Sequence, residues 1–209
     1  MRLMVSVDHM GRTGKRTGDR GASHGRTFEV DLTWRIAEGI YRAARDRVDV
    51  IVATHGDYSQ RHEWANRELV DVYLALHINA STSPTADYGA FFYHPATSPG
   101  NGDRLAGLMA TGMMDLARRG VIQADGRTRA RARGYTARAI SAAGQTWRNP
   151  RYTIAGLRRP VGICCEPWFI SSPANRALWC NTGALLEVGR VYLDACERWH
   201  QTKSPGGTT

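Results

Sequence analysis

Short apolar runs and longer amphipathic stretches alternate along the chain. Runs rich in β-branched and aromatic residues predict strands at Leu3–Val7, Val48–Ala53, Val70–Leu76, Tyr88–Tyr93 and Val161–Cys165. Apolar residues at helical spacing predict helices over Phe28–Arg47, Gln60–Leu69, Gly102–Arg118 and most of Pro173–Trp199. Strands that alternate with helices are typical of an α/β domain.

The length and composition of the chain fit one globular domain. It has 209 residues, of which 42% are hydrophobic and 22% charged. We expect a folded domain over residues 1–200 and a disordered polar tail over residues 201–209. The four cysteines are too few to hold a fold of this size together, and a disulfide between the adjacent Cys164 and Cys165 would be strained. We therefore expect free thiols, with these two packed in a buried strand.

The charge of the chain favours polyanionic partners. The formal net charge is +9, and Lys15 and Lys203 are the only lysines. A basic surface of this kind attracts nucleic acid, anionic cell-wall polymers or lipid headgroups. Arginine in place of lysine is also what a GC-rich genome produces, so this choice of residue carries little functional information.

Four titratable side chains come where predicted elements begin or end. His9 lies two residues after the first strand, His77 follows the third, and Glu166 follows the run VGICC. Glu29 stands at the start of the first long helix. Because open α/β sheets collect their ligands at the carboxyl ends of the strands, we expect these four residues at one edge of one sheet.

Two imidazoles and one carboxylate are a common zinc-binding set in hydrolases, with water as the fourth ligand. A second glutamate that does not bind the metal then serves as the general base. Taken singly, each residue also has an ordinary interpretation. A strand-end histidine is usually structural, and Glu29 in a first helical turn complements the helix dipole. Their convergence favours the zinc site.

These residues occur in an order that resembles the zinc-dependent N-acetylmuramoyl-L-alanine amidases of the Amidase_3 type. That family has Asp-Pro-Gly-His-Gly-Gly after a first strand, then Asp-x-Gly-Ala, a helix-opening Glu, Ser-Ile-His-x-Asn-Ala, and a final strand that ends in Glu. The corresponding segments here are VSVDHMG, DRGA at Asp19–Ala22, FEVDLTWRIA, VYLALHINA and ICCEPWFISS. The order matches from Leu3 to about Trp199, whereas the segment between Ala96 and Pro160 matches little.

The resemblance implies that one Zn²⁺ is bound by His9, Glu29 and His77, and that Glu166 is the catalytic residue. It also implies a catalytic domain over residues 1–200, with a twisted, mostly parallel (mixed) central sheet flanked by helices, of the phosphorylase/hydrolase-like class. The expected substrate is the amide that joins N-acetylmuramic acid to L-alanine in peptidoglycan.

The chain departs from the family pattern before its first histidine. The Pro-Gly pair is missing, so Asp8 directly precedes His9. His24 is therefore the alternative ligand. After Glu166, Pro167 replaces the small residue that the family has there.

Substrate contacts are predicted at two places. Asn79 lies two residues after His77, within the family motif. Arg127 and Arg129 belong to a charge run that is otherwise typical of a solvated loop. We expect all three to bind substrate, and the charge run to contact anionic wall polymers.

Two further motifs resemble known sites incompletely. The segment HEWAN begins like a His-Glu-x-x-His zinc motif at His62, but Asn66 replaces the second histidine, which favours an ordinary helix. The segment GRTGKRTGDRG resembles a phosphate-binding loop, but Arg16 stands where a serine or threonine should follow the lysine. We interpret it as a flexible, basic rim of the substrate groove.

The biological role is predicted from the amino terminus. The apolar run at the amino terminus ends at Asp8, and this run is too short for the core of a signal peptide. We therefore expect a bacteriophage endolysin that is made in the host cytoplasm and reaches the wall after holin-type release. Its expected partners are peptidoglycan and anionic wall polymers. We expect no nucleic acid, no membrane partner and a monomer.

Three alternatives stay open at this point. A zinc peptidase could cut stem peptides rather than the sugar–peptide amide. A non-enzymatic basic protein could bind nucleic acid or another polyanion. A wall-binding protein that has lost its zinc would explain the altered segment before His9.

Overall fold

The computed structural model describes residues 1–83, 88–95, 101–119, 135–139, 153–173, 175–176 and 180–202. Its centre is a six-stranded sheet with the strand order β4-β1-β5-β8-β6-β7. The strands are β1 (Arg2–Val7), β4 (Asp49–Ala53), β5 (Val72–Leu76), β6 (Gly89–Tyr93), β7 (Tyr135–Ala139) and β8 (Val161–Glu166). The pairs β4-β1, β1-β5, β5-β8 and β6-β7 are parallel, and only β6-β8 is antiparallel among the described strand pairs of this sheet.

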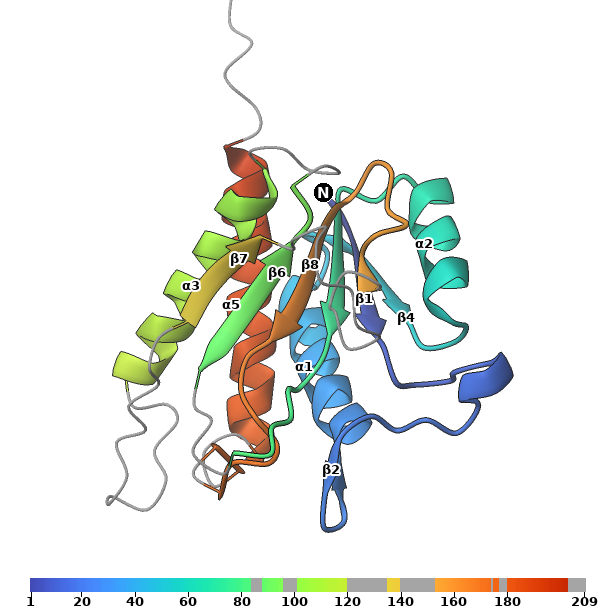
Figure 1. Cartoon of the computed structure of the whole chain (residues 1–209). Helices are drawn as coiled ribbons and strands as arrows, with labels where there is room; N and C mark the ends of the chain where they lie inside the picture. Colours follow the sequence, from blue (N-terminus) through green and yellow to red (C-terminus); the bar gives the residue numbers. More distant parts are fainter. Residues whose placement is uncertain are drawn as a thin grey trace, which may run out of the picture.

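Helices cover both faces of the sheet (Figure 1). They are α1 (Glu29–Ala44), α2 (Tyr58–Arg67), α3 (Gly102–Arg118) and α5 (Thr182–Gln201). Helices α1, α3 and α5 pack together on one face, and α2 lies on the other. A two-stranded hairpin of β2 (Ser23–His24) and β3 (Thr27–Phe28) precedes α1.

The alternation of side chains along the strands divides the core into two parts. In β1, Leu3 and Val5 pack with α1 and α5, whereas Met4 joins the smaller cluster that includes Ala65 of α2. All five residues of β5 are buried, because the strand is central and both faces of the sheet are covered.

The fold class predicted from the sequence is confirmed: a single α/β domain with a mostly parallel, mixed sheet flanked by helices. The helix Gly102–Arg118 has its predicted bounds. Most of Pro173–Trp199 was expected to be helical. Helix α5 covers Thr182–Gln201, with the Asn181 side chain as its cap, and Pro173, Asn175 and Arg176 are helical as well. The hairpin and β7 were not predicted.

Some predictions lie outside the described residues. These include Arg127 and Arg129 and residues 203–209 of the expected tail, whose first residue, Gln201, still belongs to α5. Among the helices that the structure describes, none combines the length and the apolar character needed to cross a membrane.

Three strands deliver side chains to one edge of the sheet in a common register. Val7 at the end of β1 pairs with Leu76 of β5, which in turn pairs with Cys165 of β8. Asp8 follows Val7, His77 follows Leu76, and Glu166 follows Cys165. The strand ends thus place one titratable group each in a row.

Candidate metal centre and active site

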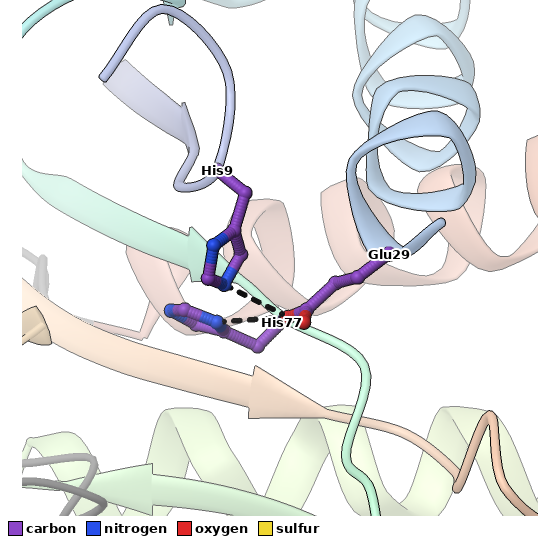
Figure 2. A group of neighbouring side chains, drawn as sticks. All are labelled: His9, Glu29 and His77. Carbon is purple, nitrogen blue, oxygen red and sulfur yellow. Dashed lines mark hydrogen bonds and ion pairs between the residues drawn. The ribbon is translucent and has the colours of Figure 1, made fainter. Parts of the chain in front are cut away.

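His9, Glu29 and His77 meet at the carboxyl edge of the sheet (Figure 2). His9 lies on the loop after β1, Glu29 is the first residue of α1, and His77 follows β5. One ligand atom from each residue lies within 4.8 Å of the others. The sequence prediction that these residues come together is met by the geometry.

The Glu29 carboxylate is held by contacts to both of its oxygens. Its Oε1 accepts a hydrogen bond from the Ile78 backbone N–H at 2.9 Å, and its Oε2 accepts one from the Ala22 N–H at 2.8 Å. Oε1 also lies 3.0 Å from Nδ1 of His77 and 3.4 Å from Nε2 of His9. Burial alone would raise the pKa of Glu29, but the two imidazoles outweigh it and lower the pKa.

Each imidazole turns its second nitrogen towards another carboxylate. Nε2 of His77 lies 2.7 Å from Oδ2 of Asp8, and Nδ1 of His9 lies 3.2 Å from Oδ2 of Asp19. Burial opposes a charged His77, yet the charge of Asp8 and its hydrogen bond raise the histidine pKa well above its ordinary value. Histidines that bind metals in proteins are commonly oriented by a carboxylate in this way.

The buried Arg61 side chain fixes Asp8 and the loop that follows it. Asp8 is fully buried, accepts a hydrogen bond from the Ser6 hydroxyl and lies 3.4 Å from Nη1 of Arg61. Burial favours a protonated Asp8, but the charges of His77 and Arg61 lower its pKa. Arg61 also donates to the Ser6 hydroxyl and to the backbone carbonyls of Val7, Met10, His55 and Gly56. These bonds hold the shortened segment in which Asp8 directly precedes the histidine.

Gly21 allows the loop before α1 to pass close to the site. It has a φ of +74°, and a Cβ atom there would lie 2.5 Å from Oε2 of Glu29 and 2.8 Å from the ring of His9. The Gly21 N–H donates to Oδ1 of Asp19 at 2.9 Å, which orients the carboxylate that faces His9. Only glycine fits this combination of left-handed backbone and close contact.

Glu166 ends β8, beside the metal-binding group. Burial raises its pKa to about 7, against the opposing charge of His77. The Asn79 side chain also opposes the rise of the Glu166 pKa, and Oδ1 of Asn79 accepts a hydrogen bond from the Ala80 N–H at 2.8 Å. The Asn79 N–H donates to the carbonyl of Trp168 at 2.9 Å, which ties the two strand exits together. A carboxyl group with a pKa near neutrality can both accept and return a proton.

The other histidines considered from the sequence lie elsewhere. His24 is exposed on β2 and does not belong to the group of ligand atoms. His62 lies on α2, an ordinary helix as predicted, with its Nε2 2.8 Å from the carbonyl of Thr153. Cys164 and Cys165 are buried free thiols in β8, also as predicted.

Sequence reasoning missed the residues that support the group. Asp8 was noted only because the Pro-Gly pair is absent, and Arg61 was not considered. One signal was available: Arg61 lies one turn before Ala65 on the buried face of α2, and a charged residue at such a position needs buried partners.

The donor set fits a zinc ion. Two imidazole nitrogens and a carboxylate oxygen are zinc ligands in catalytic sites. The carboxylates of Asp8 and Asp19 leave Nδ1 of His77 and Nε2 of His9 facing Glu29, where a shared metal would lie. The two nitrogens that face Glu29 can bind a metal, because the other nitrogen of each ring can carry the proton.

The family model of the Amidase_3 type, described as N-acetylmuramoyl-L-alanine amidase, matches residues 6–182. The chain belongs to this amidase family. The predicted enzyme class, an N-acetylmuramoyl-L-alanine amidase acting on peptidoglycan, is thereby confirmed. The matched segment contains His9, Glu29, His77 and Glu166. No curated protein matches the sequence of this amidase.

Solved structures of amidases share the fold over almost the whole chain. The catalytic domain of CwlV from Bacillus (Paenibacillus) polymyxa var. colistinus is 13% identical, with a TM-score of 0.71 over 96% of this chain and 98% of that one. AmiC2 of Nostoc punctiforme is 14% identical, with a TM-score of 0.69 over 96% and 97%. A putative amidase from Neisseria meningitidis is 21% identical, with a TM-score of 0.64 over 95% and 96%.

Proposed function

We propose that this amidase is zinc-dependent, with His9, Glu29 and His77 as the metal ligands and Glu166 as the general base. One observation carries the proposal: both imidazoles turn one nitrogen to Glu29 and the other to a carboxylate. The hydrogen bond with Asp8 fixes the tautomer of His77. Nδ1 of His9 faces the Asp19 carboxylate at 3.2 Å, a distance that favours a proton on this nitrogen although the geometry is not that of a hydrogen bond.

Glu166 provides the proton transfer. A bound zinc ion supplies Lewis acidity, which polarises the scissile carbonyl and acidifies the attacking water. Glu166 takes a proton from that water as its oxygen adds to the carbonyl carbon. The carbon–nitrogen bond then breaks, and Glu166 returns the proton to the leaving amine. The products are the lactyl carboxylate of the sugar and a peptide with a free L-alanine amino group.

The experiment measures the turbidity of a peptidoglycan suspension with purified protein, before and after chelation and after zinc is returned. We expect lysis to stop on chelation and to resume with zinc. Mass spectrometry of the products should find free amino groups on L-alanine and intact glycan strands. A cut inside the stem peptide would favour the zinc peptidase, and lysis that is insensitive to chelation would contradict zinc dependence.

The endolysin role and the contact with anionic wall polymers stay predictions. Expression in a bacterial host with and without a co-expressed holin tests the first. The endolysin role predicts lysis only when the holin is present, and lysis in both cultures, or in neither, would argue against it.

A further inference from the structure

Arg12 is a buried cation with unused hydrogen-bond donors. Its side chain is only 4% exposed, and within the described part of the chain its buried Nε, Nη1 and Nη2 atoms have no hydrogen-bond partner. Its described contact is a cation–π interaction, with the guanidinium carbon 3.7 Å from the ring centroid of Tyr58. That contact uses the face of the tyrosine ring and leaves the N–H donors unbonded.

The neighbouring Arg61 is a buried arginine with a structural role, and its hydrogen bonds differ from those of Arg12. Every nitrogen of its guanidinium donates to a hydroxyl or backbone carbonyl of the surrounding loops. Among the residues that the structure describes, Arg61 therefore has hydrogen-bond acceptors and Arg12 has none, although the Asp57 carboxylate is close enough for the charge of Arg12 to lower its pKa. Because a buried unpaired cation is strongly destabilising, donors of this kind are suited to an anionic ligand.

Arg12 lies beside the metal-binding group. It follows His9 by three residues, so their Cα atoms are at most about 10 Å apart. The loop is held at this point by the Gly56 N–H, which donates to the carbonyl of Gly11 at 3.0 Å. Tyr58, on which Arg12 stacks, is close enough to His77 and Asp8 for their charges to influence its pKa.

We propose that Arg12 and Tyr58 form a carboxylate-binding subsite that holds a free carboxylate of the stem peptide while the amide lies at the metal centre. The inference rests on the proposed function. A guanidinium offers two parallel N–H donors that match the two oxygens of one carboxylate. Stem peptides of peptidoglycan carry such carboxylates close to the L-alanine whose amide is cut.

The test compares two muropeptides that differ only in whether the carboxylates of the stem peptide are free or amidated. For the unmodified protein we expect a KM roughly tenfold or more lower for the free acid, which is the range of a hydrogen bond to a charged group. In Arg12→Met the KM for the acid should rise to that for the amide, with kcat and the amide KM nearly unchanged. Arg67→Met removes an exposed arginine of α2 and should behave like the unmodified protein.

Two further measurements make every outcome decisive. Removal of an unpaired buried charge should leave the thermal midpoint of Arg12→Met equal to or higher than that of the unmodified protein. A lowered midpoint or failure to fold would make Arg12 a structural residue and overturn the proposal.

Calorimetric binding of both muropeptides to Glu166→Gln tests the subsite without turnover. If Glu166→Gln binds the acid more tightly than the amide and Glu166→Gln/Arg12→Met does not, the subsite is supported. If the unmodified protein cleaves neither muropeptide, that result contradicts the proposed function but not the subsite. Equal binding of acid and amide would overturn the subsite.

Discussion

Nε2 of His77 lies 2.7 Å from Oδ2 of Asp8, the residue that directly precedes the other histidine of the group. The contact joins the ends of the adjacent strands β1 and β5, whose register places Val7 opposite Leu76. One residue therefore has two effects: its carboxylate orients His77, and its backbone leads directly into the loop of His9.

Replacement of Asp8 by asparagine should weaken zinc binding. The amide oxygen lacks the charge that fixes the His77 tautomer, and loss of such an outer partner typically costs about 10–100-fold in metal affinity. Competition with a zinc-selective chelator measures the change. The matched control is Asp31→Asn, which removes an exposed carboxylate paired with Arg20 and should retain the zinc affinity of the unmodified protein. Equal affinities for the two variants would show that Asp8 does not orient a ligand.

Replacement of Arg61 by methionine should destabilise the fold itself. The change leaves Asp8 and several carbonyl groups without a buried donor, and breaking a buried ion pair in this way costs about 3–5 kcal/mol. Urea denaturation of zinc-free protein measures the free energy of unfolding without the contribution of metal binding. Arg67→Met, on the exposed part of the same helix, should leave that free energy nearly unchanged. A loss no larger than that of the control would contradict the network described for Arg61.

Replacement of Gly21 by alanine should damage the metal site more than the fold. Alanine in a left-handed conformation costs about 1–2 kcal/mol, and here its Cβ also displaces the Glu29 carboxylate. Gly18→Ala is the matched control, since Gly18 has a φ of +80° and open space around its Cβ position. Both variants should lower the thermal midpoint, whereas only Gly21→Ala should lower zinc affinity. The same zinc affinity in both would mean that the close approach at Gly21 is unimportant.

Replacement of Glu166 by glutamine should abolish turnover and keep the metal. Glutamine retains the shape of the side chain but cannot accept the proton, and general-base catalysis typically contributes about 10²–10⁴-fold. The rate of lysis and the zinc content of the same sample measure the two effects together. Glu63→Gln, exposed on α2, is the control. A full lytic rate with zinc retained would exclude Glu166 as the base.

Much of the fold was predictable because its main elements have strong local patterns. The buried run VYLAL and the amphipathic helix Gly102–Arg118 each specify their structure within a few residues. The strands of the β2–β3 hairpin have only two residues each, too few for an alternating pattern. The start of α5 at Thr182 depends on the Asn181 cap, which the pattern of apolar residues does not reveal.

The candidate ligands were also predictable, because each stands at the end of an element and the order resembles a known family. The supporting contacts were not. Asp8 and Arg61 are 53 residues apart in sequence, and their contact depends on how α2 packs against the end of β1. That Arg12 has no hydrogen-bond partner among the described residues likewise becomes visible only in the folded structure.

The central claim is that one zinc ion is held by His9, Glu29 and His77. An anomalous difference map at the zinc absorption edge, from crystals of the zinc-loaded protein, tests it most directly. We predict one strong peak in contact with Nε2 of His9, Nδ1 of His77 and the Glu29 carboxylate. A peak at His24 instead of His9, or no peak between these three residues, would contradict it.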